Sequence, residues 1–509
     1  METSGFSEIK KSSKLDQYGR EELTQRYTVL EAETLRLIKE NYELRNQKIS
    51  DQQLQFVMDE QLNSLRDSLF GKSSERYKKP KNETPDPKPD PKPRVKKPSE
   101  RYPNIPVREQ VIPMDPAPNC PCCLNLMTDS GMTEDSEQLT VIPKKYEIIL
   151  QKRVKYRCNC HGSIVTAPAP GRIIEGSTYS DEMIQDIVVS KYCDLIPIQR
   201  YTAMAERGGL KDLPSQSLIE LTHQFADFVS GAYTLIKDGV LNSRVLHADE
   251  TPHKMLEGST KKNWFLWGFS TETLCYLDCR NTRSGDVAEA ILSKSKCEVL
   301  LSDVYSGYGR AIRICNKARD PLGLPLVQCA FCNAHARRYF FKSFPTYKEA
   351  QFFLDHYHEI YQLNSKSKGK PPPEVLELRA QMRPLFEEMK NRAYQELSTY
   401  SAQSKYGKGL NYFLENYKGL TLFLNDSEVP IDNNSQERLL RSHVVGRKTW
   451  YGTHSERGAF TAAVLFSLVE TCKLNQVNPR SYFKSLVTDL LAGEKPYTPA
   501  DFKSQNLSC

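Results

Sequence analysis

The chain has 509 residues, of which 39% are apolar, so it is long enough for about three or four domains of the usual size. Its formal net charge of +7 is modest for this length, and no run of about 18 apolar residues occurs, so we expect no membrane span. The opening residues METSGFSEIKKSSK contain no apolar signal-peptide core. Fourteen cysteines without an export signal indicate a reducing, cytoplasmic compartment, where clustered cysteines bind metal more often than they pair.

Residues 1–78 are predicted to form a coiled-coil, leucine-zipper-like helix. Leu23, Leu30, Leu37 and Leu44 recur every seven residues, and no proline interrupts residues 20–70. An apolar stripe of this kind needs a partner helix, so we predict a homodimer through this segment. The alternative is a helix that packs on its own protein.

Residues 79–104 are predicted to be a linker rich in proline and lysine. The run PDPKPDPKP favours extended polyproline backbone and prevents helix formation. Between Lys72 and Arg101 there are eleven Lys or Arg and five Asp or Glu. This basic excess suits a polyanion such as DNA, although a charged and merely solubilising linker would have the same composition.

Residues 105–175 contain two cysteine clusters, NCPCCLN and KYRCNCHG, and are predicted to be a small β module that binds structural Zn²⁺. The stretch between the clusters, QLTVIPKKYEIILQKRVKYR, alternates apolar and polar residues as a β-hairpin does. Two ligands at positions i and i+3 of a tight turn can both bind the same zinc ion, so two such turns supply the four ligands. The predicted ligands are Cys120, Cys123, Cys158 and His161, with Cys122 and Cys160 as alternatives.

Residues 176–240 follow with a helical pattern that Pro197, Gly208, Gly209 and Pro214 divide into short segments. Short helices with tight turns are typical of a helix-turn-helix DNA reader. A plain helical connector is an equal alternative, because the segment is not strongly basic.

Residues 241–475 are predicted to be an α/β catalytic domain that carries three separated acidic residues. VLHADETP and CEVLLSDVYSGYGR read as buried strands that end at Asp249 and Asp303, and IDNNSQERLL reads as a helix start with Glu437 in its first turn. Acidic residues just past strand ends lie at a sheet edge, where α/β proteins bind ligands. Residues 476–509 are predicted to be a C-terminal tail.

Three carboxylates suit phosphodiester chemistry, because two Mg²⁺ (or Mn²⁺) ions stabilise the charge on the attacking and leaving oxygens together. Such ions take hard oxygen ligands and keep several waters, so a few carboxylates hold the pair. Each acid also has an ordinary explanation. Asp249 and Asp303 could be turn or cap residues, and Glu437 could close a capping box with Asn434 or pair with Arg441.

The helix that follows Glu437 is basic and then aromatic, which suits contact with DNA phosphates and stacking on an unpaired base. The candidate DNA-binding residues are Arg438, Arg441, Arg447, Lys448 and Trp450, with Tyr451 as an alternative for stacking. CAFCNAHARRYF offers Cys332 and His335 as a possible ligand pair, but a structural role is preferred. Residues of about 340–420 read as a helical insertion.

Taken together, the motifs resemble those of transposases of the insertion sequence sixty-six family, over about residues 30–483. The stretches that carry the resemblance are QLNSLRDSLFGKSSERY, CPCC, KYRCNCHG, APAPGR, VLHADETP, LLSDVYSGYGR, CNAHARRYF and PIDNNSQERLLRSHVVGRKTWYGTHSERGA. The resemblance implies a multidomain α/β chain with a leucine-zipper-like N-terminus, a zinc-binding module and an RNase H-like mixed-sheet core with a helical insertion. Asp249, Asp303 and Glu437 fall on the family's presumed catalytic triad.

The expected function is a DNA transposase that binds terminal inverted repeats, nicks them and transfers the freed 3′-hydroxyl to target DNA. Its expected partners are double-stranded DNA, a second copy of the chain and small accessory proteins of the same element, in the nucleoid of a bacterial cytoplasm. Two other readings stay open: a catalytically silent dimeric DNA-binding regulator, and an RNase H-like resolvase or repair nuclease.

Overall fold

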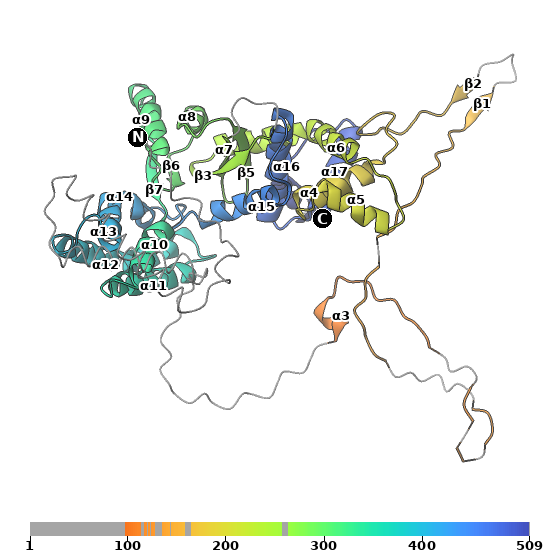
Figure 1. Cartoon of the computed structure of the whole chain (residues 1–509), viewed down its shortest axis with the longest axis horizontal. Helices are drawn as coiled ribbons and strands as arrows, with labels where there is room; N and C mark the ends of the chain where they lie inside the picture. Colours follow the sequence, from red (N-terminus) through yellow and green to blue (C-terminus); the bar gives the residue numbers. More distant parts are fainter. Residues whose placement is uncertain are drawn as a thin grey trace, which may run out of the picture. The chain divides into compact units, whose positions relative to one another are not determined.

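The computed structural model describes residues 97–507, apart from 113–116, 120, 123, 128–134, 143, 158–163 and 257–262. The predicted coiled coil and most of the linker therefore lie outside the described residues. The chain divides into two compact units, one made of residues 76–151 and 208–210 and the other made of the rest. Figure 1 shows the chain with its elements labelled.

The smaller unit has little regular structure in its described part. It contains the short helix α3 (Pro98–Arg101) and an isolated bridge between Asn119 and Leu126. The side chain of Glu137 accepts hydrogen bonds from both the backbone and the hydroxyl of Ser99. Many of its apolar side chains are exposed, so these residues contribute little to a hydrophobic core.

The hairpin predicted between the cysteine clusters is largely absent. Within the described part of residues 138–157, only Lys155–Arg157 forms a strand, β1, which pairs antiparallel with β2 (Ile164–Thr166). A two-stranded ribbon is marginal without a layer to cover it, and Ile148 is 98% exposed. Alternation of apolar residues was therefore an insufficient signal for strands here.

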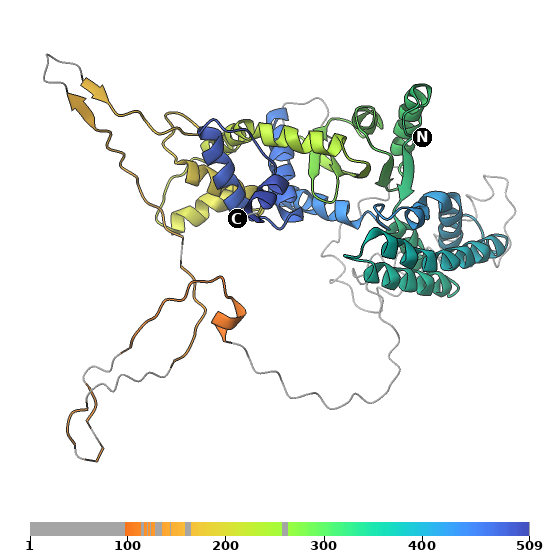
Figure 2. The ribbon, with the colours of Figure 1, turned by 180° about the vertical axis from the view of Figure 1, so that it is seen from behind.

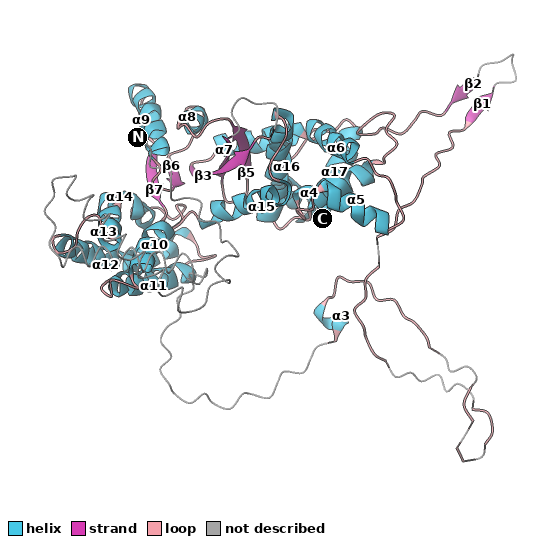
Figure 3. Ribbon diagram, in the orientation of Figure 1, coloured by secondary structure: helices cyan, strands magenta, loops and turns pink. Residues whose placement is uncertain are grey.

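The larger unit is built on a five-stranded sheet, and the prediction of a mixed α/β class is confirmed. The strand order is β5-β4-β3-β6-β7, in which β3 to β5 form an antiparallel meander and β6 and β7 run parallel to β3. Figure 3 shows the strands surrounded by helices. The strands are β3 (Val245–Lys254), β4 (Asn263–Ser270), β5 (Cys275–Arg280), β6 (Val299–Ser302) and β7 (Gln328–Phe331).

The first hydrophobic core joins the sheet to helices from both ends of the sequence. The predicted helical segment forms α4 to α7, which pack with α16 and α17 around the β5 side of the sheet, as the view from behind in Figure 2 also shows. These helices are α4 (Asp181–Tyr192), α5 (Ile198–Arg207), α6 (Ser215–Phe228), α7 (Ser230–Leu241), α16 (Glu456–Leu474), α17 (Pro479–Leu491) and α18 (Pro499–Leu507). The segment expected as a C-terminal tail is thus helical and contributes Tyr482 and Phe483 to the core.

Helix α16 also covers the free edge of β5. The backbone N–H groups of Cys275 and Leu277 donate to the hydroxyls of Thr471 and Ser467, which lie one helical turn apart. Edge strands present unpaired backbone groups that favour aggregation, so this contact satisfies donors that pairing with β4 leaves free. Helix α8 (Asp286–Leu292) connects β5 to β6, and helix α9 (Ser306–Arg319) connects β6 to β7.

A second core lies on the β7 side and consists mainly of the predicted helical insertion. Its helices are α10 (Asn333–Ser343), α11 (Ala350–Lys366), α12 (Pro372–Leu397), α13 (Lys405–Glu415) and α14 (Tyr417–Leu420). Val299 and Leu301 of β6 point into this core, while Leu300 belongs to the first core. The two faces of one strand therefore hold the two halves of the unit together. In the part of the chain that the structure describes, no helix is long and apolar enough to cross a bilayer.

Candidate active site

Asp249 and Asp303 lie on neighbouring parallel strands. Val245 pairs with Val299 and His247 with Leu301, and the same register continued by two residues places Asp249 level with Asp303. Asp303 directly follows the last residue of β6, as predicted. Asp249, however, lies inside β3 rather than past its end, because β3 continues to pair with β4 as far as Lys254. The parallel pairing stops before Asp249, so both acids lie where that pairing ends.

Asp249 has an acidic neighbour, Glu250, that points to the other face of the sheet. The buried Glu250 carboxylate accepts hydrogen bonds from Arg283 and from the hydroxyl of Tyr308, both at 2.9 Å or less. The carboxylate of Asp249 accepts a bond from the backbone N–H of Glu250. Glu250 is therefore held in a structural ion pair, whereas Asp249 retains acceptor capacity for a ligand.

Glu437 is brought to the sheet by the first turn of α15 (Asn434–Trp450). The residue before this helix, Asn433, anchors it on β3: its Oδ1 accepts from His247 Nδ1 at 2.8 Å, and its Nδ2 donates to the carbonyl of Ala248 at 2.8 Å. Both partners directly precede Asp249 in the sequence. A buried side-chain amide thus ties the start of the Glu437 helix to the strand of Asp249.

Gly268 of β4 allows the close approach of α15 to the sheet. It pairs with Asp249 across the β3–β4 ladder, so a side chain here would point to the same face as Asp249. A Cβ atom at this position would lie 2.0 Å from Gln436 Nε2 and 3.2 Å from Leu440 Cδ2. The absence of a side chain therefore provides the space in which the residue next to Glu437 packs.

The environment of Asp249 disfavours the charged form of its carboxyl group. Burial raises the pKa of Asp249 to about 7, and the negative charges of Glu250, Asp303 and Glu437 add to that effect. Carboxylates collected in this way repel one another unless a cation neutralises them. In addition, Glu437 Oε1 is a buried acceptor with no hydrogen-bond partner.

The ordinary explanations for these acids account for only part of the geometry. Asp303 Oδ1 does accept from the backbone N–H of Tyr305, as a turn residue would. The N-cap of α15 makes no side-chain cap, and the side chain of Asn433 bonds to β3 instead. Among the described residues, no ion pair joins Glu437 to Arg441; the basic group paired with Glu437 is His335.

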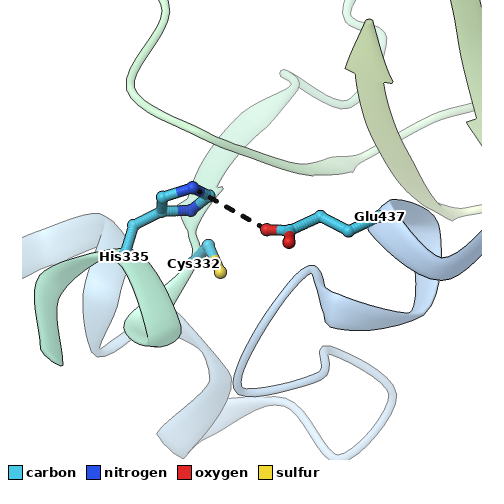
Figure 4. A group of neighbouring side chains, drawn as sticks. All are labelled: Cys332, His335 and Glu437. Atoms are coloured by element: carbon cyan, nitrogen blue, oxygen red, sulfur yellow. Dashed lines mark ion pairs between the residues drawn. The ribbon is translucent and has the colours of Figure 1, made fainter. Parts of the chain in front are cut away.

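Cys332 and His335 meet Glu437, as Figure 4 shows. Cys332 is the N-cap of α10 and His335 lies in its first turn, whereas Cys329 lies in β7. One ligand atom from each of Cys332, His335 and Glu437 lies within 4.8 Å of the others. The sequence analysis favoured a structural role for Cys332 and His335. Their spacing of three residues was the signal that they could act as a pair of metal ligands. No local pattern indicated that Glu437 would lie beside them.

The basic residues of α15 lie in different environments. Arg438, Arg441 and Lys448 are exposed, and their spacing of three and seven places them on one face of the helix. Arg447 is half-buried, and burial lowers its pKa. Trp450 packs against the first core with Lys191 over its ring, while Tyr451, at φ 68°, is 73% exposed. Tyr451 is therefore the more accessible aromatic of the two.

The predicted zinc ligands Cys120, Cys123, Cys158 and His161 lie outside the described residues, as does the alternative Cys160. Cys122 is described and is an exposed free cysteine.

The fold is that of a mixed α/β protein, and Asp249 lies within electrostatic reach of Asp303 and Glu437. Among the described residues, however, the ligand atoms of these three acids do not all lie within 4.8 Å of one another. Residues 176–461 match the model of a family described as "Transposase IS66 family". Since the match spans more than half of the chain, the chain belongs to the IS66 family of transposases, which confirms the resemblance seen in the motifs.

The chain is also similar to proteins of Sinorhizobium fredii. The uncharacterized protein y4hP is 26% identical over 417 residues, which cover 77% of this chain and 73% of that protein. The uncharacterized protein y4qI is 29% identical over 382 residues, covering 70% and 68%. The uncharacterized protein y4jD is 27% identical over 392 residues, covering 74% and 75%. The similarity thus extends over most of each chain.

Proposed function

We propose that this chain is a DDE-type transposase that nicks DNA and performs strand transfer with Asp249, Asp303 and Glu437. The observation that carries the proposal concerns Asp249: burial raises its pKa to about 7, and the charges of Asp303 and Glu437, which are far apart in the sequence, add to that rise. Family membership supports the transposase class. Buried acids near other negative charges are costly unless they bind cations.

The donor set fits divalent metal ions. All three groups offer carboxylate oxygens, the ligands that Mg²⁺ or Mn²⁺ prefers. A pair of such ions, when bound, stabilises charge on the attacking and leaving oxygens of a phosphodiester. Asp249, Asp303 and Glu437 are the residues that would hold such ions. No protein nucleophile is assigned, because water and a DNA 3′-hydroxyl serve as the attacking groups.

The sheet topology supports an RNase H-like core. The antiparallel meander β3 to β5 continues through the parallel strands β6 and β7, and such a mixed sheet fits the RNase H-like core that the motif resemblance implied. The first acid lies on the central strand, the second on its parallel neighbour and the third on a later helix. The helical insertion lies between the second and third acids in the sequence.

The exposed face of α15 is proposed to bind the DNA backbone. Arg438, Arg441 and Lys448 begin one residue after Glu437, so phosphates bound along this face would lie beside the acidic cluster. Cationic side chains on phosphates position a duplex without reading its sequence. Tyr451, or Trp450 after local movement, is proposed to stack on an unpaired base at a processed end.

Recognition of the terminal repeats is proposed to use the N-terminal part of the chain. The predicted zinc module and linker would bind DNA, and the predicted coiled coil would join two copies, so that two element ends are held together. Such a protein would act on DNA in the bacterial cytoplasm, with accessory proteins of the element as further candidate partners.

Strand transfer provides the test. With labelled terminal-repeat DNA and Mg²⁺, the wild-type chain is expected to nick and to join ends to a target, and Asp303→Asn is expected to reduce both by at least about a thousandfold, which corresponds to the loss of roughly 4 kcal/mol of transition-state stabilisation. Asp286→Asn is a matched control, because Asp286 is exposed and paired with Arg310 away from the site.

Three outcomes would contradict the proposal. Full activity in Asp303→Asn would remove this residue from the site. Repeat binding without any metal-dependent nicking by the wild-type chain would favour a silent regulator. Cleavage of branched DNA without joining would favour a resolvase or repair nuclease.

A further inference from the structure

A thiol, an imidazole and a carboxylate lie close together where helices α10 and α15 begin. The imidazole Nε2 of His335 lies 3.7 Å from Glu437 Oε1, and Figure 4 shows the two side chains pointing toward each other with Cys332 below them. One ligand atom of each of the three residues lies within 4.8 Å of the others. Cys332 is fully buried, whereas the side chains of His335 and Glu437 are each 29% exposed. The group is therefore closed on the cysteine side and open to solvent on the other.

Backbone contacts fix the relative position of these donors. The N–H of Asn433 donates to Cys332 Sγ at 3.2 Å, and the N–H of His335 donates to the carbonyl of Cys332 at 3.2 Å. The buried side chain of Asn333 donates to the carbonyls of Leu420 and Ile431. These bonds join the start of α10 to the segment before α15, so the three donors are held on one frame.

Two buried polar atoms of the group have no hydrogen-bond partner. They are His335 Nδ1 and Glu437 Oε1, and both belong to side chains that face the group. The 3.7 Å separation of His335 Nε2 from Glu437 Oε1 is too long for a hydrogen bond. Because a buried polar atom without a partner costs about 1–3 kcal/mol, native sites seldom retain such atoms without a ligand.

We propose that Cys332, His335 and Glu437 bind one divalent ion of the zinc class, separate from the ions proposed at Asp249 and Asp303. Sulfur, imidazole nitrogen and a single carboxylate oxygen are zinc donors, whereas Mg²⁺ binds poorly to sulfur and nitrogen. Three protein ligands leave the fourth tetrahedral position to water, on the solvent-exposed side of the group. Binding of the ion displaces the thiol proton of Cys332 to solvent.

The consequence for the proposed function concerns Glu437, which both sites share. An ion bound at Oε1 leaves the other carboxylate oxygen for the site of Asp249 and Asp303, and it holds the side chain in one orientation. His335 and Cys332 would thus be positioning residues for the third catalytic carboxylate. This consequence rests on the proposed function, but binding of the ion itself does not.

Cobalt titration of the full chain tests the site. Co²⁺ replaces zinc, and a bound thiolate gives a charge-transfer absorption that identifies cysteine as a ligand. The predicted N-terminal zinc module also offers thiolates, so the readout is the difference between the wild type and variants that leave that module intact. Cys332→Ser is expected to lower the number of cobalt ions bound per chain by one. His335→Gln is expected to lower the affinity for that ion at least about tenfold.

Cys329→Ser is the matched control, because this cysteine lies three residues earlier, in β7, and outside the group. Equal cobalt capacity and absorption in the wild type, Cys332→Ser and His335→Gln would overturn the inference. A fold check by circular dichroism separates ligand loss from unfolding, and His335→Gln provides a second, partly exposed position if Cys332→Ser does not fold.

Asp303→Asn separates this inference from the proposed function. It is expected to abolish strand transfer and to leave unchanged the thiolate–cobalt absorption that Cys332→Ser removes. If no absorption depends on Cys332 while strand transfer depends on Asp303, the inference fails and the proposed function stands. If that absorption depends on Cys332 while strand transfer does not need Asp303, the inference stands and the proposed function fails.

Discussion

At the scale of single residues, environment separates side chains that the sequence presents as equivalent. Asp249 and Glu250 are adjacent acids, yet Glu250 is neutralised by Arg283 on one face, while Asp249 faces α15 on the other. Burial raises the pKa of both groups, but for Glu250 the bonds to Tyr308 and Arg283 act in the opposite direction. The difference follows from the alternation of side chains along β3, which sends neighbours to opposite faces.

A pair of buried histidines shows the same dependence on environment. His253 Nδ1 and His443 Nε2 share a hydrogen bond of 2.9 Å, and His253 Nε2 lies 2.8 Å from the hydroxyl of Thr453. Burial, helped by the charge of Arg447, lowers the pKa of His253 to about 4, and it also lowers the pKa of His443 well below the usual value of 6.5. Both rings are therefore neutral in the folded chain near neutral pH.

The histidine pair predicts a loss of stability in acid. Because the unfolded chain binds these protons more tightly than the folded chain, the free energy of unfolding is greatest above pH 6.5 and falls as the pH decreases toward 4. For His253 alone the shift corresponds to roughly 3 kcal/mol. Urea denaturation of the wild type and of the double variant His253→Gln/His443→Gln across this range is expected to give a shallower decline for the variant.

His454→Gln removes an exposed imidazole and serves as the control. Parallel declines in the wild type and the double variant would show that these histidines do not carry the acid sensitivity.

At the scale of elements, α15 combines three tasks on its different faces. Its first turn carries Glu437, the residue before it is anchored on β3 through Asn433, and Leu439 and Leu440 bury its inner face in the first core. The outer face carries Arg438, Arg441 and Lys448. A helix can divide these tasks because its periodicity separates the inner and outer residues by about half a turn.

The outer face of α15 predicts a salt-dependent contribution to DNA binding. The triple variant Arg438→Gln/Arg441→Gln/Lys448→Gln is expected to weaken binding to any duplex. It should also lower the slope of log affinity against log salt by about 0.9 for each phosphate that the variant no longer neutralises. Fluorescence anisotropy at several salt concentrations measures that slope.

Lys294→Gln/Arg313→Gln/Lys317→Gln removes the same charge from exposed positions in or near α8 and α9 and is the matched control. The assignment of this face would be wrong if both triple variants lowered the slope equally, since net charge alone would then explain the effect.

At the scale of the whole molecule, function depends on contacts between distant parts of the chain. The insertion and its core occupy most of the sequence between Asp303 and Glu437, yet Asn333 bonds back to the carbonyl of Ile431 just before α15. The insertion therefore closes on itself and returns the chain to the sheet. The bond between Asn333 and Ile431 thus joins the residues on either side of the insertion, close to the start of α15.

The predicted coiled coil determines the expected assembly of the full chain. Leu30→Lys with Leu37→Lys places charges in the apolar stripe, so the full-length chain is expected to shift from dimer to monomer in analytical ultracentrifugation. Thr28→Lys with Ala32→Lys adds the same charge off the stripe and should leave the dimer intact. A wild-type chain that sediments as a monomer, or a stripe variant that remains dimeric, would remove this role from residues 1–78.

Local patterns in the sequence were sufficient for several features of this protein. Buried apolar runs followed by acids located β3, β6, Asp249 and Asp303, and a helix-start pattern placed Glu437 in the first turn of α15. Pro and Gly residues marked the ends of the helices that became α4 to α6. These signals are short-range: they depend on strand alternation, helix periodicity and backbone restriction within about a dozen residues. The same patterns misled at residues 138–157, where alternation was present without a layer to bury it, and at residues 476–509, where helices that pack on the first core were read as a tail.

Contacts between distant segments, by contrast, could be known only once the chain was folded. The β3–β6 register that brings Asp249 level with Asp303, the anchoring of α15 by Asn433, the space left by Gly268 and the meeting of Cys332 and His335 with Glu437 all join segments that are far apart in the sequence. Such contacts depend on which faces of a sheet and a helix become buried against each other, and no local pattern specifies that choice. The order of the amino acids supplied the residues available for chemistry, and the packing of two cores around one sheet selected those that lie together.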